Sequence, residues 1–280
     1  MPKSKFLTEQ DTIYSTEITK ATNTLGDIKV GDNLQNKSIK EILKAIIQPY
    51  KQLEISNLQL TNSSGSNINN VILEKGGTDI FTLGEISCNI TIYSDPPNSY
   101  KITQNDGTTL TTLTTVSQFS GNSILYDFKN KEINQKKSDS DEKITFTIEI
   151  TDTKNKTISP RTSINYIRPY YWGTVLDTDI FDPESFATTT TSDTHNYAIS
   201  SNKPTSLSFN GEGNNAYSVI MYPKSYGKLK SIKDPNGFSQ EWTLLDDNGI
   251  TIVKNDIDLS YYVYKSGTST FDTITYNFAW

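Results

Sequence analysis

Four carboxylates stand close together in the second half of the chain, at Asp177, Asp179, Asp182 and Glu184. Such a group could coordinate calcium, which takes about six to eight oxygen ligands. It could also supply the carboxyl pair of a glycoside hydrolase, held about 5–5.5 or 6.5–9.5 Å apart. No glycine and terminal glutamate follow at the spacing of a calcium-binding loop. The sequence alone does not give the distance between two carboxyl groups, so it does not identify a glycosidase pair. We therefore expect a solvated loop here and at Ser138–Glu142, and no metal site.

Histidine and cysteine, two residue types common in catalytic sites, each occur once. His195 lies in the polar run TTTTSDTHNY, without the sharp turn that presents a catalytic serine, so we interpret it as part of a surface loop. Cys88 shares a strand face with Ile86, Ile90 and Ile92, which predicts a buried thiol. The segment 210–215 begins like a phosphate loop but lacks a third glycine and a following helix. We expect no catalytic residue, no cofactor and no enzymatic activity.

Aromatic residues are concentrated in the last third of the chain. Aromatic faces with polar neighbours can hold sugars or a partner's side chains, but the cores of small β-domains use the same residues. Both interpretations stay open, with the core favoured. Strand alternation places Tyr261 and Val263 on one face and Tyr262 and Tyr264 on the other, so that one pair could be exposed. The candidate binding surface comprises Tyr171, Trp172, Tyr222, Tyr226, Tyr262 and Tyr264.

Charge and composition argue against two kinds of partner. The 280 residues carry a net charge of −6, whereas contacts to nucleic-acid phosphates need clustered Lys and Arg. No stretch approaches the ~18 apolar residues of a membrane span, and the N-terminus has no apolar signal segment. We therefore expect neither a nucleic-acid nor a membrane partner, and synthesis in a cytoplasm.

The one good helix signal lies within residues 26–50. Ser38 and Glu41 form a capping box, and Pro49 ends the helix because the residue before a proline avoids the α region. A helix of about ten residues is marginal alone in water, so either the body of the protein or other copies must cover its apolar stripe. That stripe comprises Ile39, Ile42, Leu43, Ile46 and Ile47.

The rest of the chain has the two-residue period of strands. Short alternating runs such as Ile144–Ile150 are separated by turn signals, as in a β-sandwich. We predict an arm and a helix over residues 1–52, an immunoglobulin-like β-sandwich over 53–168 and a C-terminal β-sandwich-like domain over 169–280. The predicted fold class is mainly β with one amphipathic helix.

The order of three local patterns resembles a group of bacteriophage virion proteins of the tail-fibre and head-fibre type. The first pattern comprises Gly26–Asp32, Ser38–Leu43 and Pro49; the second is Tyr-Tyr-Trp-Gly at Tyr170–Gly173. The third comprises Met221–Gly227, Ile232–Phe238 and Tyr261–Tyr264. Together they cover about half the chain, and the middle module matches only in general type.

The resemblance implies a non-enzymatic subunit of a fibre-like appendage on the head, neck or tail of the virion. It further implies a homotrimer, with the N-terminal unit used for trimerisation or for attachment to other virion proteins. A receptor-binding or glycan-degrading fibre tip, with a host surface glycan as partner, is the alternative. A bacterial surface adhesin of stacked β-modules is a weaker one, because neither a signal peptide nor a wall anchor is evident.

Overall fold

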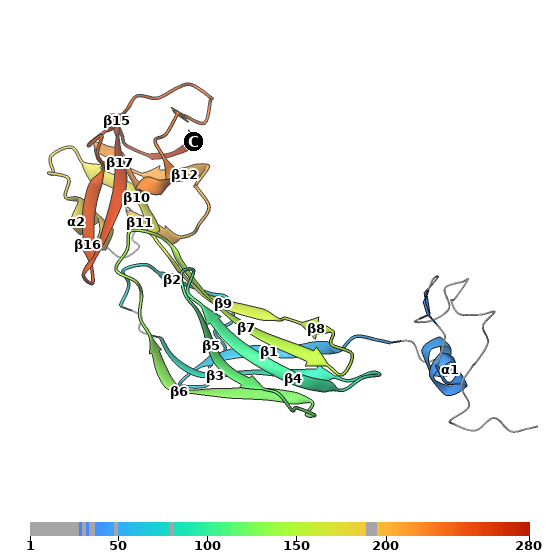
Figure 1. Cartoon of the computed structure of the whole chain (residues 1–280). Helices are drawn as coiled ribbons and strands as arrows, with labels where there is room; N and C mark the ends of the chain where they lie inside the picture. The colour runs from blue at the N-terminus through green and yellow to red at the C-terminus, as the bar shows by residue number, and fades with distance from the viewer. Residues whose placement is uncertain (1–27, 30–31, 34–36, 48–49, 79–80, 189–194) are drawn as a thin grey trace, which may run out of the picture.

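A computed structural model of the chain describes residues 28–29, 32–33, 37–47, 50–78, 81–188 and 195–280. Residues 1–27 of the predicted arm-and-helix unit lie outside the described residues. Strands dominate, as the two-residue period predicts, and the prediction of a mainly β fold is confirmed. Figure 1 shows two β-modules joined at an angle, with helix α1 (Ile39–Ile47) beyond the end of the first module.

The first module is a sandwich of two sheets. One sheet has the order β1-β3-β6 and the other β2-β9-β7-β4-β5, with β8 added to β7. All pairs are antiparallel except β2 with β9. The strands are β1 (Glu54–Asn62), β2 (Val71–Glu74), β3 (Phe81–Thr91), β4 (Pro97–Asn105), β5 (Leu110–Val116), β6 (Ser123–Ile133), β7 (Glu142–Asp152), β8 (Thr157–Ile158) and β9 (Arg161–Ile167).

Alternation along β3 and β7 builds the core of this sandwich. In β7 every second residue from Ile144 to Ile150 is buried, and its neighbours face outward. Ile86, Cys88 and Ile90 do the same in β3, so the prediction of a buried thiol is confirmed. Ile92, predicted on the same face, follows the end of β3 and is 40 % exposed. The buried residues of this core run from Leu53 to Tyr166, with both sheets contributing. Two sheets that share one core make this module a β-sandwich.

The second module contains a six-stranded and a three-stranded antiparallel sheet. The larger has the order β11-β10-β13-β17-β15, with β16 also paired to β17, and the smaller has the order β12-β18-β14. The elements are β10 (Pro169–Leu176), α2 (Pro183–Thr188), β11 (His195–Ile199), β12 (Ser206–Asn210), β13 (Ala216–Pro223), η1 (Lys224–Tyr226), β14 (Ser231–Lys233), β15 (Trp242–Leu244), β16 (Ile250–Lys254), β17 (Ile257–Thr270) and β18 (Thr273–Ala279).

The larger sheet of this module is covered on both faces. One face packs on the smaller sheet through an aromatic core that includes Tyr222, Phe209 and Tyr276. The other face packs on α2, where Phe186 meets Val219 and neighbours. Helix α2 is an element that sequence periodicity missed, because six residues are too few to display a helical stripe. The last strand ends at Ala279, and the Trp280 indole N–H donates to the Pro204 carbonyl at 2.8 Å.

Helix α1 begins as its sequence predicts. The Ser38 backbone N–H donates to the Glu41 carboxylate at 2.7 Å, and the Glu41 N–H donates to the Ser38 hydroxyl at 3.2 Å. These are the two reciprocal bonds of a capping box. The bond from the Ser38 N–H lowers the pKa of Glu41, so the carboxylate stays ionised below the pH at which a free glutamate is protonated.

Candidate functional site

The aromatic residues predicted as a candidate binding surface form core instead. Five of the six side chains are buried in the two cores of the C-terminal module, and Trp172 is half-buried against one of these cores. Strand alternation correctly separates the Tyr262 side chain from that of Tyr261, but both faces of β17 are covered, so neither pair is exposed. The sequence could not show this because it does not reveal how many layers cover a sheet. The buried members are Tyr171, Tyr222, Tyr226, Tyr262 and Tyr264.

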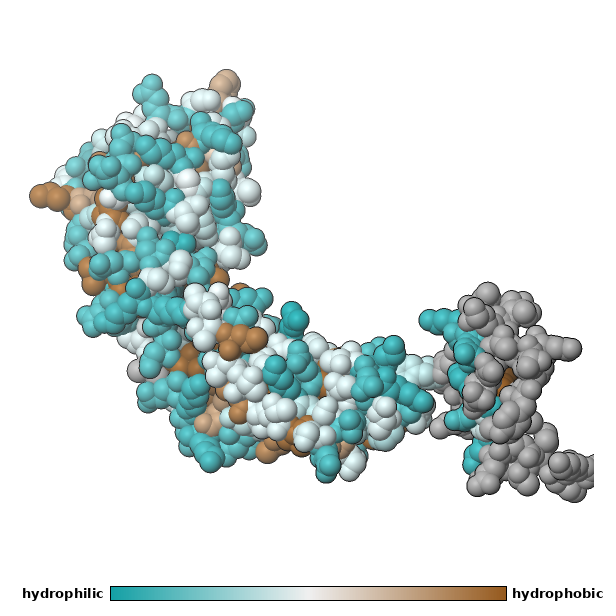
Figure 2. All heavy atoms as spheres, viewed as in Figure 1, coloured by the Kyte–Doolittle hydropathy of each residue, from teal (hydrophilic) through white to brown (hydrophobic). Residues whose placement is uncertain are grey.

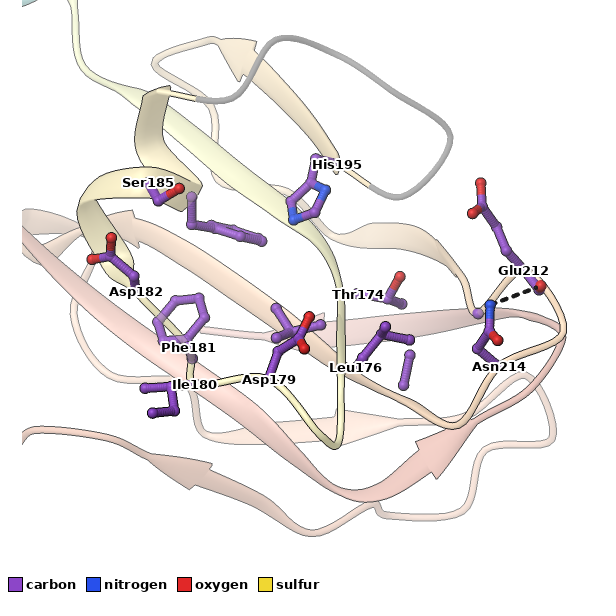
Figure 3. A pocket seen from close by; sticks show the side chains of 14 residues that line it. Thr174, Leu176, Asp179, Ile180, Phe181, Asp182, Ser185, His195, Glu212 and Asn214 are labelled. Atoms are coloured by element: carbon purple, nitrogen blue, oxygen red, sulfur yellow. Dashed lines mark hydrogen bonds between the residues drawn. The ribbon is translucent and has the colours of Figure 1, made fainter.

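A pocket of about 410 Å³ lies instead on the α2 side of the C-terminal module, within the range of small-molecule sites. Figure 3 shows its wall formed by the segment after β10, by α2 and by the turn between β12 and β13. Phe181 and Phe186 contact each other edge to face, with ring centroids 5.3 Å apart. At the mouth, the Ile180 side chain is 96 % exposed. The pocket thus has a mixed lining of apolar and polar side chains, and a fully exposed apolar residue lies at its rim.

Polar groups on the rim come from three segments that lie apart in the sequence. Asp179 and Asp182 precede α2, His195 begins β11, and Glu212 and Asn214 lie in the turn before β13. Both aspartates are exposed, which confirms the prediction of a solvated segment, but the sequence did not indicate that they border a pocket. The carboxylates can accept hydrogen bonds from hydroxyl or amine groups of a ligand.

The pocket's acidic groups do not assemble a metal centre. Across the described residues, no three His, Cys, Asp or Glu side chains converge closely enough to hold a metal ion. The Asp182 carboxylate already accepts the Glu184 backbone N–H at 3.2 Å, as a cap of helix α2. The 210–215 segment is a turn closed by an Asn214 N–H to Gly211 carbonyl bond of 2.9 Å, as predicted.

His195 is not the surface-loop residue that its polar neighbours predict. It is the first residue of β11, is half-buried, and packs its ring 5.0 Å from that of Phe186. Burial lowers its pKa, and the Glu212 carboxylate opposes that shift. The sequence signal failed because a single strand residue next to polar residues has no detectable period.

We expect His195 to titrate below its usual pKa of about 6.5. The unfolded chain then binds a proton more readily than the folded chain, so this residue lowers stability as the pH falls through about 6.5. Because it is the only histidine, a single imidazole C–H resonance followed by NMR between pH 4 and 8 reports it without assignment. A Glu212→Gln variant should lower the midpoint of the His195 titration further, because the carboxylate that raises this pKa is removed. A midpoint above 6.5 would contradict the buried placement.

A buried arginine with three side-chain partners lies at the junction between the modules. Arg168 is only 5 % exposed and donates through Nε to Asp141 at 3.1 Å and through Nη1 to Asp139 at 3.0 Å. Its Nη2 donates to the Ser225 hydroxyl in the C-terminal module at 2.8 Å. The prediction of a solvated loop at Ser138–Glu142 is wrong for Glu142, which is buried, whereas Asp139 and Asp141 are exposed as predicted. The partner of these two aspartates lies 27 residues or more along the chain, a pairing that local charge patterning cannot reveal.

A second set of contacts crosses the junction from β16. The Lys254 ammonium lies 2.6 Å from both the Glu74 carboxylate and the Tyr171 hydroxyl. Burial is the main cause that raises the pKa of Tyr171, so its hydroxyl stays neutral. The Asn255 amide donates to the Gly76 carbonyl at 2.6 Å. These contacts tie the end of β2 to the C-terminal module and restrict the angle between the modules.

Gly76 offers a test of that junction. A Cβ there would lie 2.7 Å from Cβ of Lys254 and 3.2 Å from Cδ1 of Leu259, at φ +81°. Gly65 has the same φ and nothing within 4 Å, so it is a matched control. We expect Gly65→Ala to lower the free energy of unfolding by about 1 kcal/mol, because alanine disfavours the left-handed conformation. Gly76→Ala should lower the free energy of unfolding by about 1–3 kcal/mol more, because the added methyl group overpacks the junction.

Tryptophan fluorescence and cysteine labelling report the unfolding of the two modules separately, so the two alanine variants can be compared in each module. All three tryptophans lie in the C-terminal module, and the only cysteine lies in the sandwich. Burial raises the pKa of the Cys88 thiol to about 11, so thiol reagents report its exposure on unfolding. Urea titrations followed by tryptophan fluorescence and by thiol labelling measure each module in turn. Equal losses for the two alanine variants would contradict tight packing at the junction.

The predicted assembly stripe lies on α1. Leu43 is 48 % exposed, and Ile42 and Ile46 are partly buried. The side chains of Ile39 and Ile47 lie outside the described residues. Helix α1 stands beyond the end of the sandwich in Figure 1, and in the view of Figure 2 both β-modules are mainly hydrophilic with small separated apolar spots. An exposed leucine on a short helix is a candidate contact for another chain.

Comparison with known proteins adds no family. A scan against protein-family models finds no match, and a search of the curated proteins finds no similar sequence. Among the described residues, no helix has both the length and the apolar character needed to cross a membrane.

Proposed function

We propose that this chain is a structural subunit of a bacteriophage virion, in a fibre-like appendage of the head, neck or tail. In this role it acts by assembly and attachment. Three copies meet through α1, and the two β-modules of each copy project from that point. The tail-fibre and head-fibre resemblance of the three sequence patterns supplies the virion assignment.

The observation that carries the proposal is the half-exposed Leu43 on a helix that stands off the sandwich. A short helix of this kind gains stability only when its apolar face is covered. The angle between the β-modules, supported by Arg168 and Lys254, suits a projecting arm, because hydrogen bonds and ion pairs resist bending there.

Electron microscopy of the purified full chain tests this function. We expect class averages with three bent arms that radiate from one point, each arm containing two modules. Averages that contain only separate two-module rods would contradict the proposal. Detection of the chain in purified virions by mass spectrometry is the corresponding test of location.

The second candidate function is a receptor-binding fibre tip, and the pocket beside α2 favours it. The rim carboxylates Asp179 and Glu212 can accept hydrogen bonds from sugar hydroxyls, and Phe181 offers an apolar surface. A glycan array probed with the full chain should then show binding that an Asp179→Asn/Glu212→Gln variant loses. Absence of binding by the unaltered chain would remove this candidate.

A further inference from the structure

Strand β5 is the open edge of the five-stranded path in the sandwich. It pairs with β4 from Leu110 opposite Asn105 to Val116 opposite Tyr100, and no other described strand pairs with it. An edge strand leaves alternate backbone N–H and C=O groups free to pair with a further strand. The register between β4 and β5 shifts once, so that Leu113 is an extra residue on β5, and its side chain packs on the core.

The other described edges of the two modules carry features that oppose such pairing. Strand β1 contains Asn57 in a left-handed conformation and two register shifts. Strand β6 contains four charged residues and left-handed conformations at Lys129 and Asn130. The remaining edge strands have five residues or fewer. Charges, kinks and shortness are the ways in which proteins protect sheet edges.

Apart from the one register irregularity at Leu113, strand β5 has none of these protections. No Asp, Glu, Lys, Arg or Pro occurs between Gly107 and Tyr126, and β5 has no left-handed residue. Its sequence, LTTLTTV, consists of leucine and β-branched residues, and Leu110 is 63 % exposed. Threonine and valine favour paired strands. An edge of this length and composition is suited to receive another strand.

We infer that β5 receives an added strand from residues 12–19 of this protein. That segment, TIYSTEIT, has six β-branched or aromatic residues and a single charge, which matches the composition of β5. It belongs to the 27 residues that precede the first described residue, Ile28. Residues 20–27 link the segment to Ile28, and fully extended these eight residues span roughly 27 Å. Backbone hydrogen bonds supply the affinity, as in other β-strand additions.

Amide hydrogen exchange of the full chain tests this inference. Proline at position 16 removes a backbone donor and disfavours pairing, so Thr16→Pro should release β5, and its amides should exchange at least ~10-fold faster. Ser4→Pro lies outside the segment and is the matched control, with exchange in β5 unchanged. Tryptophan fluorescence and Cys88 labelling confirm that both modules stay folded.

The outcomes are distinct. Slow exchange in β5 that Thr16→Pro abolishes supports the added strand. Protection that falls on 100-fold dilution assigns the strand to a neighbouring copy, and protection independent of concentration assigns it to the same copy. Equal exchange in β5 for the unaltered chain and both proline variants would overturn the inference. The result does not depend on the trimer, because α1 stays intact in every variant.

Discussion

Replacing Leu43 and Ile46 by aspartate is expected to convert the assembled protein to monomers while both β-modules remain folded. Each change places a charge on the apolar side of α1, and burying an unpaired carboxylate between copies costs several kcal/mol. Three copies would bury three such pairs around one axis. Sedimentation velocity at micromolar concentration measures the change in mass.

The matched control is Leu245→Asp. Leu245 is 40 % exposed, close to the value of Leu43, but it lies in the C-terminal module. We expect this variant to sediment like the unaltered protein. If Leu43→Asp/Ile46→Asp sediments like Leu245→Asp, then α1 does not hold the copies together, and its stripe serves only its own chain.

The second large effect is expected at Lys75, inside the sandwich. Its side chain is fully buried, and its ammonium lies 3.1 Å from the Glu142 carboxylate and 2.6 Å from the Lys136 carbonyl. Lys75→Met keeps the volume but leaves Glu142 as a buried, uncompensated carboxylate. Removing one partner of a buried ion pair destabilises a protein by about 3–5 kcal/mol.

Urea unfolding followed through Cys88 labelling measures that loss in the sandwich. Lys143→Met, an exposed neighbour of Glu142 on β7, is the control and should stay within about 0.5 kcal/mol of the unaltered chain. Lys75→Met/Glu142→Gln should recover much of the loss, because no buried charge is left unpaired. If Lys75→Met is as stable as Lys143→Met, the ion pair between Lys75 and Glu142 contributes little to the free energy of unfolding.

The strands and the helix could be predicted because each has a local signal. Alternation in Ile144–Ile150 fixed β7 and its buried face, and Ser38 with Glu41 fixed the start of α1. The buried residues form one core in the first module, which ends at Tyr166, and two cores in the second, which begin at Tyr170 and Tyr171. Period and capping act within a few residues, so a single sequence contains them.

The candidate site and the junction could not be predicted because they depend on distant pairs. Asp139 and Asp141 are an acidic loop in the sequence, and only the fold brings Arg168 between them. Likewise, Asp179 and Glu212 border one pocket although 33 residues separate them in the numbering. The aromatic residues failed as a binding surface for the same reason, since exposure depends on the layers that pack over each sheet face.

Native mass spectrometry of the full, unaltered chain tests the central claim most directly. The chain has a mass of 31.4 kDa. We expect a species of three times that mass at micromolar concentration, held through the apolar stripe of α1. A monomer alone over the whole concentration range would contradict assembly through α1 and, with it, the proposed fibre-like role.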